Sequence, residues 1–261
     1  MSDILQREDT GAITTLTLND PATLNSLSDE MLAALGAQLS DIAQGPQKAV
    51  ILRGAGKAFC AGHNLRQMQA MRQAPDGGAA AFADLFDRCT AVMAQMRDLP
   101  QPVIAQVHGI AAAAGCQMVA NCDMAIADTH TRFAVNGVNI GLFCSTPMVA
   151  LSRNLPRKRA FEMLTTGDAI SAQDAIDLGL INRAVDPDAL AQETTALAEK
   201  VASKLSSAVR IGKSAFYTQV ELPVADAYAL TRDAMVQNLA QPDTDEGMQA
   251  FIEKRPPEWE Q

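Results

Sequence analysis

The chain has 261 residues, of which 48% are apolar and 20% are charged, a composition typical of one large or two modest globular domains. Its 21 basic residues are outnumbered by 30 acidic ones, and the formal net charge of −9 argues against a nucleic-acid partner, because phosphate backbones attract basic faces. A small anionic ligand is not excluded, since it needs only a local cluster of donors.

The five cysteines indicate reduced thiols, because their number is odd and no Cys-x-x-Cys pair occurs. We therefore expect a cytoplasmic protein with neither a disulfide framework nor a metal site. The first nine residues are too acidic for a signal or transit peptide. The least polar run, residues 103–120, is interrupted by Gln106, His108 and Gln117, so no membrane span is expected.

The first part of the chain alternates strand and helix patterns. Ser28 is the expected N-cap of a helix whose first turn is acidic. The apolar face of that helix consists of Met31, Leu32, Leu35, Leu39 and Ile42. Strands are expected at residues 12–18 and 49–53, an amphipathic helix at 82–97, and a flexible break with Pro-Asp-Gly-Gly within 67–81.

Two stretches of small residues each follow an apolar run and precede a helix. The first is Gly109–Asp123, which follows a strand at residues 103–107 and starts a helix near Ala112. The second is Ala58–Leu65, with the sequence Ala-Phe-Cys-Ala-Gly-His-Asn-Leu. Small residues let a ligand approach the backbone, and the first turn of a helix carries unpaired N–H groups and positive dipole. Two such donors that converge predict an oxyanion hole.

The second part of the chain changes character near residue 200. Before this point we expect strands at 124–127 and 132–135, a loop at 136–147, and helices at 148–154, 157–166 and 171–177. After Pro187 four helices without strands are expected, at 189–204, 209–219, 223–241 and 243–254. We therefore divide the chain into a core of residues 1–200 and a helical C-terminal region of residues 201–261.

Five motifs in order resemble the enoyl-CoA hydratase/isomerase (crotonase) family, in register from about Ile13 to Arg255. They are Ala58–Gly62, His108-Gly109 with the turn ending at Gly115-Cys116, Asn121-Cys122-Asp123, Leu164–Ala175 with Gly179-Leu180, and Glu246–Arg255. The resemblance implies an α/β fold built as a spiral of β-β-α units. It also implies a lyase or isomerase acting on an acyl-CoA thioester in fatty acid metabolism, with no cofactor besides the coenzyme A of the substrate. Residues 201–261 would assemble a homotrimer or a dimer of trimers.

The resemblance also implies roles for particular residues. The backbone N–H groups of His63 and Ala114 would bind the thioester oxygen, each worth about 3–4 kcal/mol of transition-state stabilisation. Coenzyme A would lie along Ala61, His63, Asn64, Leu65 and Arg66, with the turn of Ala22 and Leu24 beside the nucleotide and Lys254 of a neighbouring subunit at the phosphates. Alanines 113 and 114 replace glycines that are usual in this turn, which the oxyanion hole tolerates if the local φ is negative.

The sequence departs from the family at the proton-transfer positions. Hydratases of the family use two glutamates, which correspond here to Gln117 and Gly137, and neither residue can exchange a proton at neutral pH. Hydration by the usual mechanism is therefore not expected. His63 and the segment 138–141 resemble the methylmalonyl-CoA decarboxylase branch, which has tyrosine where this chain has Cys144. Decarboxylation needs an oxyanion hole but no strong base, and a non-catalytic acyl-CoA-binding protein is a further alternative.

Several candidate residues have an ordinary structural interpretation beside the catalytic one. His63 can act through its side chain or only through its backbone, and Gln117 can make local hydrogen bonds. Asn139 can orient a ligand or serve turn geometry. Cys144 can be a nucleophile or a small core residue. A dinucleotide-binding turn at residues 109–114 is disfavoured because two of its three glycines are missing.

Overall fold

A six-stranded sheet and a three-stranded sheet form the centre of the protein, and the computed structural model describes residues 4–259. In the large sheet β1 is antiparallel to β2, and all other neighbours are parallel. Its order is β1 (Leu5–Thr10), β2 (Ile13–Leu18), β3 (Ala49–Gly54), β4 (Val103–Val107), β6 (Met124–Asp128) and β9 (Arg183–Val185). The small sheet contains β5 (Ile110–Ala112), β7 (Arg132–Ala134) and β8 (Ile170–Ser171). Because β4 leads to β5 and β6 leads to β7, the chain alternates between the sheets as it winds.

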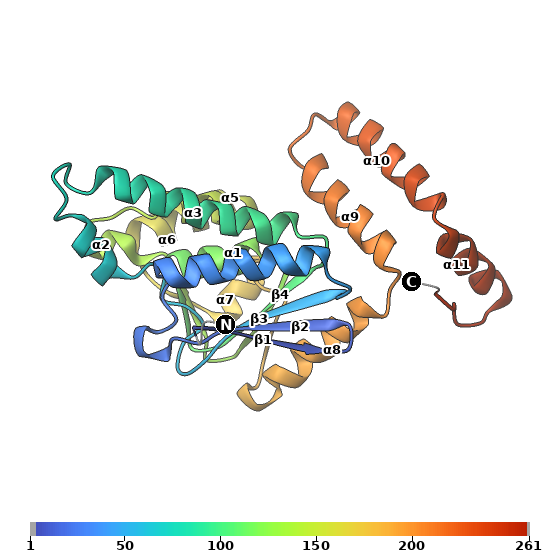
Figure 1. The fold of residues 1–261 in the computed structure, drawn as a ribbon, viewed down its shortest axis with the longest axis horizontal. Helices are drawn as coiled ribbons and strands as arrows, with labels where there is room; N and C mark the ends of the chain where they lie inside the picture. Colours follow the sequence, from blue (N-terminus) through green and yellow to red (C-terminus); the bar gives the residue numbers. More distant parts are fainter. Residues whose placement is uncertain (1–3, 260–261) are drawn as a thin grey trace.

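Helices cover both faces of the large sheet (Figure 1). Helices α1 (Asp29–Gln44) and α3 (Ala79–Asp98) lie against one face, and α8 (Leu190–Ala202) lies against the other. In β3, Val50 and Leu52 belong to the main core, whereas Ala49 and Ile51 join Ala198 in a smaller core under α8. Burial on both faces explains why β3 begins with a continuous apolar run, residues 49–52.

The remaining helices surround the two sheets or extend from them. Figure 1 shows α9, α10 and α11 extending away from the sheets as a C-terminal arm. The helices are α2 (Leu65–Met71), α4 (Ala114–Asn121), α5 (Pro147–Asn154), α6 (Arg157–Thr166), α7 (Ala172–Asp177), α9 (Ser206–Gln219), α10 (Val224–Leu239) and α11 (Pro242–Glu253), with 3-10 turns η1 (Pro21–Thr23), η2 (Asn136–Ile140) and η3 (Pro187–Ala189). Within residues 4–259, no helix has the length and apolar character needed to cross a bilayer.

Local signals in the sequence correctly predicted the first helix. The Ser28 hydroxyl accepts a hydrogen bond from the backbone N–H of Met31 at 3.2 Å, as expected of an N-cap. The buried residues of α1 are Met31, Leu32, Leu35, Leu39 and Ile42, the five that were predicted. Ser171 likewise begins α7, where it forms a capping box with Asp174.

Other predictions were wrong where pairing between distant segments decides the structure. The helix expected near Ala112 begins at Ala114, because residues 110–112 pair with β7 as a strand of the small sheet. Strand β1 was not predicted, because its mostly polar residues form an edge strand whose single neighbour in the described part of the chain is β2. The short strands β8 and β9 carry too few residues to produce a periodic pattern.

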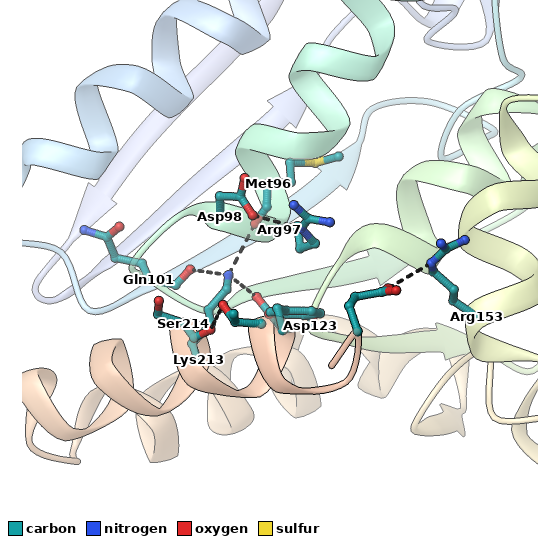
Figure 2. Close-up of polar contacts among 11 residues, drawn as sticks. Met96, Arg97, Asp98, Gln101, Asp123, Arg153, Lys213 and Ser214 are labelled. Carbon is teal, nitrogen blue, oxygen red and sulfur yellow. Dashed lines mark hydrogen bonds and ion pairs between the residues drawn. The ribbon is translucent and has the colours of Figure 1, made fainter. Parts of the chain in front are cut away.

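A buried ion pair attaches the C-terminal arm to the core (Figure 2). The Nζ of Lys213 in α9 lies 2.6 Å from the Asp123 carboxylate and donates to the carbonyls of Met96 and Gln101 at 3.2 and 3.1 Å. Asp123 also accepts hydrogen bonds from the Tyr217 hydroxyl and from the backbone N–H of Val103. The side chains of Lys213 and Asp123 are only 7% and 12% exposed, so α9 docks through a desolvated polar contact.

Candidate active site

The two small-residue turns identified in the sequence lie against each other. Cys60 pairs with Ala111: the Cys60 N–H donates to the Ile110 carbonyl, and the Ala112 N–H donates to the Cys60 carbonyl at 2.9 Å. A Cβ added at Gly115 would lie 2.2 Å from the Cys60 carbonyl oxygen, and one at Gly62 would lie 3.3 Å from the Ala114 nitrogen. The close contact between the turns therefore depends on glycine at both positions.

Among residues 4–259, hydrogen bonding leaves the backbone N–H groups of His63 and Ala114 without an acceptor. The Gly62 carbonyl accepts from the Leu27 N–H at 2.8 Å, and since a trans peptide directs C=O and N–H oppositely, the His63 N–H points away from Leu27. The Ala113 carbonyl accepts from the Gln117 N–H at 3.1 Å, so the Ala114 N–H points out of the start of α4. Neither amide has a protein acceptor among the residues described.

Both residues line one cavity of about 330 Å³, a size typical of small-molecule sites. The wall is mostly apolar and comes from α2, α3, the start of α4, η2 and the loop before α5. The lining residues are Ala61, His63, Leu65, Met68, Phe86, Ala113, Ala114, Asn136, Gly137, Asn139, Ile140, Leu142, Phe143, Cys144, Ser145, Thr146 and Pro147.

The structure brings about half of the predicted site residues together. Ala61, His63, Leu65, Ala114, Asn139 and Cys144 line the cavity, whereas Ala22, Leu24, Asn64, Arg66, Gln117 and Lys254 do not. The turn that carries Ala22 and Leu24 is adjacent to the cavity, because the Leu24 carbonyl accepts from the Ala61 N–H at 3.0 Å. Asn64 caps α2 through hydrogen bonds from the N–H groups of Arg66 and Gln67. Lys254 ends α11 on the C-terminal arm.

The sequence analysis identified Ala61, Leu65 and Ala114 but missed the rest of the apolar wall. Phe86 lies in the segment that was expected only to be an amphipathic helix, and its partly buried side chain contributes to the cavity. Leu142 and Phe143 belong to a segment that was expected only to be a loop. Helical periodicity identifies an apolar face, but it cannot distinguish a face that packs against the core from one that borders a cavity.

The lining contains no lysine, arginine, aspartate or glutamate. Its titratable side chains are His63 and Cys144. Burial lowers the pKa of His63, with a smaller opposing contribution from the Leu27 backbone, and burial raises the pKa of the Cys144 thiol. Both side chains are therefore uncharged at neutral pH.

The residues at the two positions that correspond to the family glutamates cannot exchange a proton with a ligand in the cavity. Gln117 is 5% exposed, is absent from the cavity lining, and has an Oε1 without a hydrogen-bond partner in the described part of the chain. A Cβ at Gly137 would lie 2.2 Å from the Leu142 carbonyl oxygen and 2.8 Å from the Cys144 Sγ. The space for a side chain at position 137 is therefore occupied by the following loop.

The oxyanion hole was expected to tolerate alanine in this turn if the local φ is negative. At Ala113 the φ is positive. Its φ of 48° and ψ of −116° are unusual for a residue with a Cβ, whereas Ala114 is the first residue of α4. The strain therefore falls on the residue before the helix, where glycine would be relaxed.

The spiral of β-β-α units and the two free amides beside one cavity define a crotonase-fold protein, as the sequence predicted. Residues 8–261 match the family model described as enoyl-CoA hydratase/isomerase, and the chain belongs to this family. The solved structure of an enoyl-CoA hydratase from Mycobacterium smegmatis superposes with a TM-score of 0.96 at 50% identity, covering 100% of both chains. The structure of human enoyl Coenzyme A hydratase domain-containing protein 3 gives a TM-score of 0.93 at 42% identity, covering 98% of this chain and 100% of that one.

Curated relatives contradict the expected cytoplasmic location. Enoyl-CoA hydratase domain-containing protein 3, mitochondrial, from Xenopus laevis is 44% identical over 98% of this chain and 85% of its own length. The relatives of the same name from human, rat, mouse and zebrafish are also mitochondrial. The cytoplasmic prediction was wrong because unpaired cysteines argue only against an oxidising compartment and do not distinguish among reducing ones.

Proposed function

We propose that the cavity binds the acyl group of an acyl-CoA thioester and that the N–H groups of His63 and Ala114 stabilise the enolate oxygen. The observation that carries this proposal is that both amides lack a protein acceptor among the described residues and belong to residues that line one cavity. Preorganised donors of this kind stabilise developing negative charge without reorganisation, and each is worth about 3–4 kcal/mol. Coenzyme A would extend past Asn64 and Arg66 and the turn of Ala22 and Leu24, and no further cofactor is required.

The reaction we favour is enolate chemistry of the hydratase/isomerase kind that does not use a glutamate pair. This is supported by the family membership together with Gln117 and Gly137 at the two glutamate positions. Replacing both with glutamate is not a clean restoration test, because a side chain at position 137 would have to displace the Leu142 carbonyl.

The proposal is tested with Ala114→Pro. Proline removes the Ala114 N–H and suits the first position of a helix, but it disfavours the backbone of Ala113 at φ 48° and ψ −116°, so thioester binding by the variant is measured as well. With product analysis by mass spectrometry on a panel of enoyl-, malonyl- and methylmalonyl-CoA, we expect this variant to lose about 100- to 1,000-fold in kcat. Far-UV circular dichroism checks that the fold is retained. Turnover by the variant at the wild-type rate, or no turnover of any thioester by the wild type, contradicts the proposal.

The same panel separates the two alternatives. Release of CO₂ from methylmalonyl-CoA would support the decarboxylase, in which the amides of Asn136 and Asn139 on the cavity wall could orient a carboxylate. Thioester binding by calorimetry without any product would instead support a non-catalytic acyl-CoA-binding protein.

We further propose that the C-terminal arm assembles homotrimers or dimers of trimers. The arm carries large apolar side chains that are mostly exposed in the single chain, including Tyr228 at 75%, Phe251 at 85% and Ile252 at 72%. In such an assembly Lys254 could reach the coenzyme A phosphates of a neighbouring subunit. Light scattering after size exclusion tests this, and a monomer at micromolar concentration contradicts it.

A further inference from the structure

The cavity is closed in two of the directions that an acyl chain could take from the free amides. Toward the two small-residue turns there is no space, since even a Cβ at Gly115 would clash with the Cys60 carbonyl. Toward position 137 the space is filled by the Leu142 carbonyl, and the Leu142 N–H donates to the Gly137 carbonyl at 2.9 Å, which holds this loop in place. A chain attached to a bound thioester therefore has to extend elsewhere.

The open direction runs between two apolar sides of the wall. Met68 and Phe86 are partly buried, and Met68 packs against the main core, so these two side chains lie in the inner part of the cavity. The other apolar side chains of this slot are exposed, so they lie at its opening. The side from α2 and α3 consists of Leu65, Met68 and Phe86, and the side from η2 and the following loop consists of Ile140, Leu142 and Phe143.

Phe86 has a fixed position relative to the free amides. Its ring meets the His63 ring edge-on, with centroids 5.6 Å apart and an interplanar angle of 74°. Its neighbours Leu85 and Cys89 are buried in the core, which anchors this part of α3. Met68 is unbranched and can adapt its shape to a ligand, whereas the Phe86 ring cannot. The space available to a chain therefore depends chiefly on Phe86.

The volume of the cavity limits how much of a chain it can take. At about 330 Å³ it holds about 11 groups of the size of a methylene, which occupies nearly the same volume as a water molecule, about 30 Å³. The carbon, oxygen and sulfur of the thioester take about three of these places, which leaves about eight for the rest of the chain. A butanoyl group, with three carbons beyond its carbonyl, would leave more than half of this space to water.

We propose that the cavity selects medium-chain acyl groups of about eight carbons and that Phe86 sets this limit. The inference rests on the proposed function, whose substrate class it narrows. Each methylene that enters the slot exchanges water for an apolar wall, which favours binding. A methylene beyond the limit stays in water and adds little.

The test is calorimetry of the wild-type protein with butanoyl-, hexanoyl-, octanoyl-, decanoyl- and dodecanoyl-CoA, with free coenzyme A as the reference. We expect the affinity to rise about three- to fourfold for each methylene up to octanoyl-CoA, as full burial of a methylene predicts. Beyond octanoyl-CoA we expect less than about twofold for each methylene, because the added carbons remain exposed.

Two variants change the inner wall in opposite directions. Phe86→Ala lengthens the slot, so dodecanoyl-CoA should bind about 10-fold or more tightly than it binds wild type. Met68→Phe shortens the slot, so octanoyl-CoA should bind about 10-fold more weakly. In both variants the affinity for butanoyl-CoA should stay within about threefold of wild type, which a misfolded protein would not show. The matched control is Phe82→Ala, one turn earlier in α3 and outside the lining, which should leave the dependence on chain length unchanged.

The outcomes distinguish the inference from the proposed function. The inference is overturned if wild-type affinity is the same from butanoyl- to octanoyl-CoA, or if it keeps rising at the same rate to dodecanoyl-CoA. It is also overturned if Phe86→Ala and Phe82→Ala have equal effects. In each of these cases the thioesters still bind, and the proposed function stands. A wild-type protein that binds no acyl-CoA more tightly than free coenzyme A refutes the proposed function itself.

Discussion

At the scale of single residues, the site depends on backbone positions that side chains would disturb. Gly62 and Gly115 let the two turns touch, and Gly137 leaves room for the Leu142 carbonyl. Ala113 is the exception, because it keeps a Cβ at a φ of 48°. Residues held in such sparsely populated regions cost about 1–3 kcal/mol and often occur at functional sites.

Replacing Ala113 with glycine should stabilise the protein. Relief of the backbone strain outweighs the greater conformational freedom that glycine gives the unfolded chain, which costs about 0.4–1 kcal/mol. We expect a net gain of about 1 kcal/mol, equivalent to about 2–3 °C in calorimetric Tm. A control at Ala91, an exposed residue in the interior of α3, should lose stability on the same change to glycine. A lower Tm for Ala113→Gly would contradict the assigned strain.

His63 should also contribute to the pH dependence of stability. Its pKa is lowered in the folded protein, so as the pH falls the unfolded chain binds the proton first. Its contribution to the free energy of unfolding is therefore fully present above about pH 6.5 and declines below that value. Urea unfolding at about pH 7.5 and pH 5.5 measures how far the free energy of unfolding falls on acidification. This fall should be smaller for His63→Phe than for wild type. Equal losses would mean that the imidazole titrates normally.

At the scale of secondary-structure elements, helix ends and docking contacts position the site. Helix α4 begins at the free amide of Ala114 and ends next to Asp123, which α9 holds through Lys213. The carboxylate of Asp123 also accepts from the Val103 N–H at the start of β4, the strand that leads into the site. The buried ion pair thus joins the C-terminal arm to both ends of the segment that carries Ala114.

Replacing Lys213 with methionine should be strongly destabilising. Removing one partner leaves the Asp123 carboxylate buried with its charge uncompensated, which costs about 3–5 kcal/mol. Tyr217→Phe removes a single hydrogen bond to the same carboxylate and should cost about 1.5–3 kcal/mol. Arg232→Met is the control, because its ion pair with Asp233 is 70% exposed on both sides and contributes little. The free energy of unfolding in urea measures all three, and equal effects for Lys213→Met and Arg232→Met would contradict this account.

At the scale of the whole molecule, the cavity is assembled from segments between residues 61 and 147, and its lining contains no cation. A free carboxylate on the acyl group would therefore meet neutral groups such as the Asn136 and Asn139 amides but no counter-charge, and transfer of an uncompensated charge from water costs several kcal/mol. The chain contains 21 lysines and arginines, so the absence of a cation from the lining results from how the segments assemble and not from the composition.

Acyl groups that end in a carboxylate should bind much more weakly than apolar ones. We expect succinyl-CoA to bind at least about 100-fold less tightly than butanoyl-CoA, which has the same number of acyl carbons. Calorimetry with both thioesters measures this ratio, and free coenzyme A controls for the nucleotide contribution. Leu142→Arg places a cation in the lining and should reduce the ratio of the affinities for butanoyl-CoA and succinyl-CoA. Phe161→Arg changes an exposed residue of α6 and should leave this ratio unchanged. Similar affinities for the two thioesters in wild type would contradict the prediction.

The features of this protein that depend on local physics could be predicted from the sequence. Periodicity and capping predicted α1 and its buried face, and the motifs identified the family and the turns at His63 and Ala114. The remaining features depend on residues far apart in the chain. They are the strands β1 and β5, the position of Phe86 on the cavity wall, the positive φ of Ala113, and the lack of room for a side chain at Gly137. Strand pairing and cavity walls depend on which distant segments meet, and a local pattern carries no information about its neighbours in space.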